Sequence, residues 1–522
     1  MSNAKLIIFV SIFLVLFGNI AFFDNVTDIY PLTLSNFAFL GSLAIVLASL
    51  IVLLLIFSTY KYTTKPLLIA TLLVSSLTSY FMDSYSAVID PTMIQNIVQT
   101  NIDESMDLLN FKLVLYFLIL GMLPSIVVYR TKIQYGALKT ELASKLKVIV
   151  VCFLLMIFLI LIFSKFYTSF IREHKPLRYY TNPINTVYSI GKYISIRFQG
   201  SEAAVHALGT DAHIPAADID RELIILVVGE AARADRFSLN GYPRETNPLL
   251  KKEGVISFTN MRSCGTSTAV SVPCMFSNFG REEYSDINAK HTQNVLDVLT
   301  HAGVHVLWRD NNSDSKGVAL HVPYEDFKNP INNPICDVEC RDEGMLSGLQ
   351  AYIAGKKQGD ILIVLHQMGN HGPAYYKRYP QSFEQFKPVC KTSQLESCSR
   401  EEISNAYDNA ILYTDYFLSK VIGLLKQNSK GFETAMIYMS DHGESLGEAG
   451  IYLHGLPYFM APDEQKHIGA VMWFGDEFHI DQSALRNQSA NEYTHDNLFH
   501  TILGLMEIDT SVYEKNKDIV NR

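Results

Sequence analysis

Five long stretches without a charged residue constrain this chain more than any other feature. They are Leu6–Phe23, Ile29–Tyr60, Pro66–Met82, Leu113–Tyr129 and Val148–Ser164. A helix needs about 17 or more residues to cross roughly 30 Å of hydrocarbon, so each stretch is long enough to span a membrane. A cleavable signal peptide is the alternative for the first stretch. Only Lys5 precedes it and further apolar stretches follow, which favours a membrane-spanning helix instead.

The charges between these stretches orient the predicted spans. The basic residues of the second-to-third and fourth-to-fifth connections are Lys61, Lys65, Arg130, Lys132, Lys139, Lys145 and Lys147. The segment from Met82 to Phe111 contains acidic residues and no basic one. Because basic loops stay in the cytoplasm, we expect a cytoplasmic N-terminus and place everything after Lys165 outside. No charge interrupts a span, which argues against an ion pathway through the bilayer.

The remainder of the chain has a different composition. The whole chain has 522 residues and a net charge of −9, and its 15 histidines all follow the last apolar stretch. This length and distribution exclude a disordered chain, a basic nucleic-acid-binding protein and a purely intramembrane carrier. We predict a five-helix transmembrane domain over 1–165, an interfacial linker over 166–215 and a polar domain outside the membrane over 216–522. The linker carries aromatic and basic residues that suit a membrane surface, although a solvated linker remains the alternative.

The cysteines agree with an outer, oxidising location for the polar part. Cys152 lies within the fifth stretch, and the other six follow it in close pairs, which are Cys264 with Cys274, Cys336 with Cys340 and Cys390 with Cys398. Short-range pairs of this kind predict disulfides that clip loops. A metal site is the alternative for the closest pair, but no second pair or nearby histidine stands at zinc-finger spacing.

Four short apolar runs in the polar part predict buried parallel strands. They are Glu222–Val228, Val304–Trp308, Ile361–Leu365 and Ala435–Met439. The lengths between them suit helices, so the pattern predicts a doubly wound α/β sheet. Ligands bind beyond the carboxyl ends of the strands in such sheets, and this is where we expect the functional groups.

Carboxylates and imidazoles follow three of these strand ends. Glu230 follows the first run, His366 and His371 follow the third, and Asp441 and His442 follow the fourth, with His454 further on. Oxygen and nitrogen donors that converge from several strand ends predict a site for a divalent metal ion. Each histidine taken alone would be explained as a surface or hydrogen-bonded residue, so the shared position carries the prediction.

The segment between Cys264 and Cys274 supplies candidate nucleophiles. A Gly/Ser/Thr turn that leads into a helix directs N–H groups at an anion such as phosphate. A hydroxyl there could lose its proton to a metal and attack phosphorus. A simple helix-capping cluster is the alternative. Spacing alone leaves the choice open among Thr266, Ser267 and Thr268.

Five ordered motifs carry a resemblance to a known family. They are Val228–Arg233, Cys264–Cys274, Trp308–Asn312, His366–Pro373 and Ser440–Ser445. Together they resemble the phosphoethanolamine transferases of Gram-negative inner membranes, most closely those that modify lipid A. The resemblance extends over nearly the whole chain. It implies an α-helical bundle of five spans, followed over 216–522 by a periplasmic catalytic α/β domain of the alkaline-phosphatase/sulfatase type.

The resemblance also implies roles for individual residues. It implies that Thr268 is the nucleophile and that Glu230, Thr268, Asp441 and His442 bind the principal zinc ion. His371 and His454 match positions that hold a second zinc or contact the phosphoryl group. Asn312 and Lys316 match residues near the donor head group, and His366 belongs to the same region. One departure is Ser315, where many relatives carry a cysteine.

The implied reaction has two displacements. Thr268 takes phosphoethanolamine from phosphatidylethanolamine, and a phosphate of lipid A then accepts it, which lowers surface negative charge and implies resistance to polymyxins. Three alternatives stay open: transfer to inner-core sugars, transfer of phosphoglycerol with manganese in the site, and hydrolysis by a membrane-tethered phosphodiesterase. A noncatalytic scaffold is a further hypothesis. We expect a monomer in the bacterial inner membrane, with no nucleic-acid partner.

Overall fold

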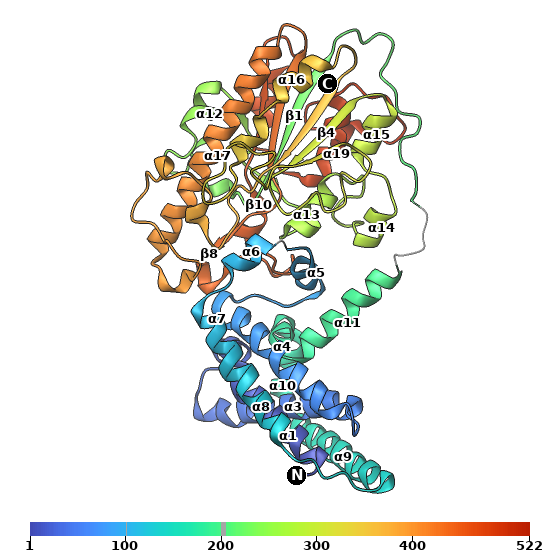
Figure 1. Cartoon of the computed structure of the whole chain (residues 1–522), viewed down its shortest axis with the longest axis vertical. Helices are drawn as coiled ribbons and strands as arrows, with labels where there is room; N and C mark the ends of the chain where they lie inside the picture. Colours follow the sequence, from blue (N-terminus) through green and yellow to red (C-terminus); the bar gives the residue numbers. More distant parts are fainter. Residues whose placement is uncertain (101, 200–204, 522) are drawn as a thin grey trace. The chain divides into compact units, whose positions relative to one another are not determined.

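The computed structural model describes residues 1–100, 102–199 and 205–521, and its chain forms two compact units (Figure 1). The first unit consists of Met1–Ile94 and Leu109–Ser195. The second joins the segment Gln95–Leu108 to the chain from Ile196 onward. A short piece between two candidate membrane helices therefore belongs to the same compact unit as the polar part of the chain.

The first unit is helical throughout. Its helices, with those at its boundaries, are α1 (Asn3–Phe17), α2 (Ile20–Ile29), α3 (Leu34–Ser58), α4 (Thr64–Tyr85), α5 (Pro91–Gln99), α7 (Phe111–Tyr116), η1 (Phe117–Met122), α8 (Leu123–Arg130), α9 (Leu138–Ile162), α10 (Ser164–Glu173), η2 (Lys175–Tyr180) and α11 (Ile184–Gln199). Within the residues that the structure describes, four helical stretches are long and apolar enough to cross a membrane, namely Asn36–Ser58, Thr64–Tyr85, Phe111–Arg130 and Leu138–Ile162. They correspond to the second to fifth predicted spans.

The first predicted span is not one straight helix. Helices α1 and α2 meet at an angle of 56°, and they amount to a fifth span only if the bent pair crosses as one. The side chain of Asn19 explains the break, because its Nδ2 donates to Leu14 O at 2.9 Å and to Asn182 O at 2.7 Å. The Asn19 side chain thus competes for a carbonyl at the end of α1, which ends the regular helix there.

The second unit is built on a seven-stranded sheet. Its strands, in spatial order, are β2 (Ile256–Ser257), β11 (Ala470–Phe474), β7 (Glu433–Ser440), β1 (Glu222–Gly229), β6 (Ile361–His366), β4 (His305–Asp310) and β5 (Tyr324–Asp326). The four predicted strands are the central ones and run parallel, which confirms the α/β prediction. Val228 pairs with His366 and Gly229 with Ser440, so three strand ends lie at one edge of the sheet.

Besides the segment Gln95–Leu108 and several short 3-10 helices, the described part of this unit contains two smaller sheets and eight further α-helices. The small sheets contain β3 (Met261–Arg262), β10 (His467–Ile468) and β12 (Tyr493–Thr494), and β8 (Ser445–Leu446) with β9 (Tyr452–Leu453). The helices are α12 (Pro248–Glu253), α13 (Thr268–Met275), α14 (Asp286–Lys290), α15 (Val295–His301), α16 (Leu349–Gly355), α17 (Arg400–Asn428), α18 (Gln482–Gln488) and α19 (Leu498–Leu505). Helices α16 and α17 lie on one side of the sheet, and α15 and α19 on the other (Figure 1).

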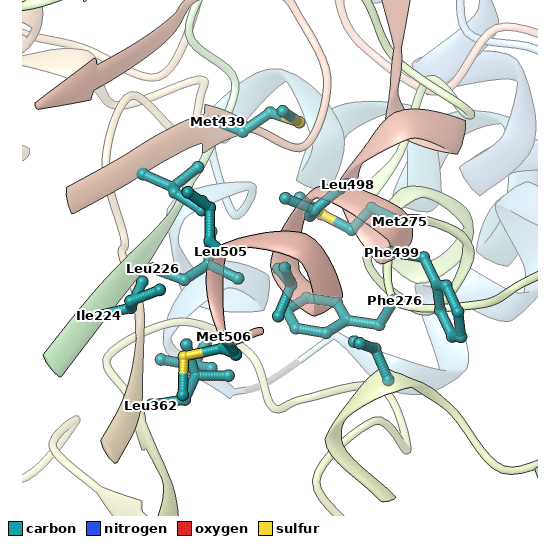
Figure 2. Packing of buried hydrophobic residues seen from close by; sticks show 14 of the residues in the cluster. Ile224, Leu226, Met275, Phe276, Leu362, Met439, Leu498, Phe499, Leu505 and Met506 are labelled. Atoms are coloured by element: carbon teal, nitrogen blue, oxygen red, sulfur yellow. The ribbon is translucent and has the colours of Figure 1, made fainter. Parts of the chain in front are cut away.

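Strand β1 contributes to a core on each face of the sheet. Leu223, Ile225 and Val227 pack with α17 on one face, whereas Ile224 and Leu226 face α19. Figure 2 shows this second core, in which β1 side chains meet Leu505 and its neighbours. Both faces of β1 are fully buried, which explains why its sequence is a continuous apolar run.

All three predicted disulfides form. The bonded pairs are Cys264–Cys274, Cys336–Cys340 and Cys390–Cys398. Cys152 is a free thiol buried in α9. The first disulfide has a direct consequence for the site, because it ties the loop before α13 to the last turn of that helix.

Candidate active site

Thr268 is the first residue of helix α13, next to the carboxyl edge of the central sheet. Its side chain is buried, and Ser267 before it adopts an extended backbone conformation. The positive end of the helix dipole favours negative charge on groups at this position. Together with the disulfide across α13, this placement holds the hydroxyl in a fixed direction.

Side chains from three segments of the chain form a cluster around Thr268. Its Oγ1 donates to Glu230 Oε2 at 3.0 Å and lies 3.3 Å from His442 Nε2. His442 Nε2 also lies 3.2 Å from Glu230 Oε1 and 3.3 Å from Asp441 Oδ2. Glu230, Asp441 and His442 are completely buried. The structure therefore brings together four of the residues that the resemblance implies for the principal metal.

The hydrogen bonds of these side chains leave some of their oxygen and nitrogen atoms available as ligands for a cation. His442 Nδ1 donates to Gly443 O at 2.8 Å, so the neutral form of this imidazole has its lone pair on Nε2. Asp441 Oδ1 accepts from the N–H groups of Ala231 and His442, at 3.1 and 2.7 Å. Within the described residues, Glu230 Oε1 and Asp441 Oδ2 accept no hydrogen bond. Buried carboxylate oxygens of this kind indicate a cation site.

The electrostatics of the cluster also indicate a cation site. Burial raises the pKa of Asp441 to about 6, and the Glu230 carboxylate beside it adds to the rise. Burial alone would lower the pKa of His442, but Asp441 and Glu230 outweigh it and raise that pKa to about 10. Two buried carboxylates that share one imidazole thus favour a positive charge between them.

Two more histidines form the rim of this cluster. The ring centroid of His454 lies 4.3 Å from that of His442 and 5.4 Å from that of His371. His454 Nδ1 donates to Glu444 Oε2 at 2.7 Å. Ligand atoms of Glu230, His442 and His454 lie within 4.8 Å of one another. Burial lowers the pKa of His371 to about 3, so this imidazole is neutral.

The remaining predicted residues take different positions. The amide of Asn312 donates to Glu230 Oε2 at 2.8 Å and to Gln367 O at 2.7 Å, so Asn312 orients a carboxylate of the cluster. His366 Nδ1 donates to Asp310 Oδ2 at 2.9 Å in a buried pair. Lys316 lines a cavity of about 580 Å³ whose wall includes Ala269, the residue after Thr268. This volume is within the range of small-molecule sites.

Comparisons with known proteins cover the whole of this architecture. A family model described as Sulfatase matches residues 222–508, and one described as Phosphoethanolamine transferase EptA/EptB matches residues 46–198. The chain is 44% identical to Phosphatidylethanolamine transferase Mcr-1 of Escherichia coli, over 96% of this chain and 94% of that protein. The chain belongs to the EptA/Mcr-1 family of phosphoethanolamine transferases.

Two further relatives, both named EptA, support this family assignment. Phosphoethanolamine transferase EptA of Escherichia coli K12 is 40% identical over 96% of this chain and 93% of its own length. The solved integral membrane lipooligosaccharide phosphoethanolamine transferase EptA of Neisseria meningitidis has a TM-score of 0.96 and 36% identity, and the match covers 100% of this chain and 98% of that one. Like EptA, the protein is a multi-pass membrane enzyme with a periplasmic catalytic domain.

One buried residue beside the transferase site escaped the sequence analysis. His495, in the short helix η11 (His495–Asn497), accepts from Cys264 N–H at 3.0 Å through Nδ1 and donates to Ser440 O at 2.9 Å through Nε2. It therefore connects the loop before α13 to the strand end that carries Asp441. His495 follows no predicted strand, so the strand-end rule could not find it.

Replacing His495 with phenylalanine is expected to lower the melting temperature of the full-length protein. The change leaves a buried N–H and a buried carbonyl without partners, at about 1–3 kcal/mol each. Differential scanning fluorimetry in detergent measures the shift. His500→Phe is the matched control, because buried His500 makes one such hydrogen bond, with Glu514 N, at 3.1 Å. An equal loss in both variants would contradict the bridging role.

Proposed function

We propose that this enzyme transfers phosphoethanolamine from phosphatidylethanolamine to a phosphate of lipid A through a covalent phosphoethanolamine-Thr268 intermediate. The observation that carries this proposal is the position of Thr268 Oγ1, 3.0 Å from Glu230 and 3.3 Å from His442. The names of its relatives include phosphatidylethanolamine for Mcr-1 and lipooligosaccharide for the Neisseria protein, which supports both lipids as substrates here.

The donor set supports zinc as the metal of the principal site. Zinc bonds of about 2.0–2.1 Å place the corners of a tetrahedron about 3.3 Å apart. Four of the six pairings among Thr268, Glu230, Asp441 and His442 have distances of 3.0 to 3.3 Å, with Glu230 taking part through both of its oxygens. When bound there, zinc would lower the pKa of the Thr268 hydroxyl and stabilise negative charge on phosphoryl oxygens. His371 and His454 are the candidates for a second ion or for contact with the phosphoryl group.

The residues of the chain itself prepare the first displacement. The Thr268 O–H is directed at Glu230 Oε2, so its proton has an acceptor before substrate arrives. Asn312 holds that same carboxylate oxygen in place. The Thr268 oxygen attacks phosphorus, an oxygen–phosphorus bond forms, and the bond to diacylglycerol breaks as that alcohol leaves with a proton. The helix dipole of α13 stabilises the charge on the phosphoryl oxygens.

The second displacement reverses the roles. A phosphate oxygen of lipid A attacks the same phosphorus, the bond to Thr268 breaks, and Oγ1 recovers its proton. The position of Lys316 in the wall of the neighbouring cavity supports a contact of this residue with the head group of the donor. Adding an amine to lipid A lowers surface negative charge, so weaker binding of polymyxins follows. The protein acts as a monomer in this proposal.

A product analysis tests this function. The purified full-length protein is incubated with phosphatidylethanolamine and lipid A in mixed micelles, and the lipids are examined by mass spectrometry. We expect phosphoethanolamine on a lipid A phosphate, with none when the donor is omitted. Free phosphoethanolamine alone would indicate a phosphodiesterase, and a modified sugar of an added inner-core acceptor would indicate a different acceptor.

A further inference from the structure

Helix α6 (Ile102–Asp107) lies in the chain between two candidate membrane spans. It contributes the carboxylate of Asp107 to the catalytic unit. The helix lies in the chain after α4, and its last residue, Asp107, is four positions before Phe111, where α7 begins. The segment Gln95–Leu108 belongs to the compact unit that contains the active site.

The two oxygens of Asp107 hold two different bases. Oδ1 forms an ion pair with Lys377 Nζ, and Oδ2 accepts from Arg378 Nη2 at 3.0 Å. The side chain of Asp107 is 10% exposed and that of Arg378 only 2%. Ion pairs that are this well buried and hydrogen-bonded hold a fixed geometry, unlike exposed surface pairs.

Arg378 also contacts the backbone of an active-site residue. Its Nε donates to the carbonyl oxygen of His371 at 2.7 Å, and its Nη1 donates to Glu339. One guanidinium thus fixes Asp107, Glu339 and the peptide of a rim histidine together. The planar fork of arginine suits this task, because its N–H donors point in set directions.

The ring of His371 depends on that peptide. Its Nδ1 has no hydrogen-bond partner among the residues that the structure describes. The imidazole therefore keeps its place by packing, including the contact with His454, and by the position of its own backbone. A shift of the His371 carbonyl would move the ring with it.

We propose that Asp107 is a positioning residue for phosphoryl transfer, which acts through Arg378 on His371. The inference rests on the phosphoryl or metal contact proposed above for His371. It gives the segment between two membrane-spanning helices a defined role in the chemistry. Without the carboxylate, Arg378 and Lys377 lose their shared counter-charge, and the guanidinium no longer holds the His371 carbonyl in one place.

A double-mutant cycle in the full-length enzyme tests this coupling. We expect Asp107→Asn to lower kcat by about 10- to 100-fold, as small misplacements of active-site groups do, with the donor KM changed less than about twofold. In a His371→Ala background the same substitution is expected to change kcat by less than about twofold, because the group it positions is gone. Asp107→Glu, which keeps the charge, should recover most of the activity.

Two further variants separate positioning from general stability. Arg378→Lys keeps a positive charge beside Asp107 but removes the Nε donor to His371, so it should show the same loss and the same dependence on His371. Asp476→Asn is the control, because this carboxylate is exposed and far along the chain from the site. It should leave kcat unchanged. Melting temperatures of all variants are measured in parallel.

The outcomes are distinguishable. An equal loss from Asp107→Asn in both backgrounds would show that Asp107 acts independently of His371 and would overturn the inference, while the proposed transfer reaction would stand. A His371→Ala variant with unchanged kcat would overturn both the role of His371 and the inference that rests on it. A loss of activity that follows the melting temperature in every variant would reduce Asp107 to a structural residue.

Discussion

Replacing Thr268 with alanine is expected to abolish transfer, with a fall in rate of about a thousandfold or more. The substitution removes the Oγ1 atom, which donates a hydrogen bond to Glu230. Where catalytic residues act together, loss of the nucleophile lowers the rate by this factor or more. The small, buried side chain at the start of α13 is replaced by a good helix former, so the fold should persist. The initial rate with phosphatidylethanolamine as donor measures the loss.

The neighbouring hydroxyls provide the controls for this experiment. Ser267→Ala should retain transfer, and Thr266→Ala should act mainly on stability because Thr266 Oγ1 donates to Leu456 O at 2.6 Å. Thr268→Ser keeps a hydroxyl and should retain part of the rate. Intact-protein mass spectrometry after exposure to donor alone should locate phosphoethanolamine on Thr268. Its appearance on Ser267 or Thr266 would show that the nucleophile is misassigned.

Removal of the metal is expected to have the second large effect. Asp441→Asn takes away one of the two carboxylates that face His442 Nε2, at 3.3 Å. We expect the variant to lose its bound zinc and its transferase activity. In the wild-type protein, dialysis against a chelator should lower the melting temperature and zinc should restore it, since a ligand at 100 times its Kd stabilises the folded state by about 2.7 kcal/mol.

A second buried aspartate gives the matched control for the metal experiment. Asp342 is also buried, but its carboxylate accepts from Asn311, Met368 N and Gly369 N rather than facing the cluster. Asp342→Asn should keep the zinc content of the wild-type protein even where it lowers stability. Full zinc occupancy in Asp441→Asn, measured by elemental analysis, would remove Asp441 from the ligand set.

The central sheet could be predicted because its strands are buried on both faces. A strand such as β1 then has a continuous apolar sequence that stands out from its surroundings. The edge strands β2 and β5 are too short to leave a pattern, and β11 lacked a strand prediction although Ala470–Phe474 is apolar. The bend between α1 and α2 was missed because a single buried Asn19 hardly alters hydropathy.

The sequence could predict those residues of the candidate site that follow the ends of predicted strands. Glu230, Asp441 and His442 follow predicted strands, whereas spacing alone could not choose Thr268 from its neighbours and the family resemblance did so. His495 and Asp107 reach the site through hydrogen bonds and ion pairs that join distant parts of the chain. Such contacts depend on tertiary packing, which local periodicity does not encode.

The disulfide between Cys264 and Cys274 also governs when the enzyme can mature. A dithiol pair stays reduced in the cytoplasm and becomes bonded in the periplasm. The loop before α13 therefore receives its covalent tether only after export of the domain. Newly made chains therefore acquire this tether, and with it the fixed start of α13, only in the oxidising compartment where the domain works, so maturation of the enzyme depends on oxidation after export.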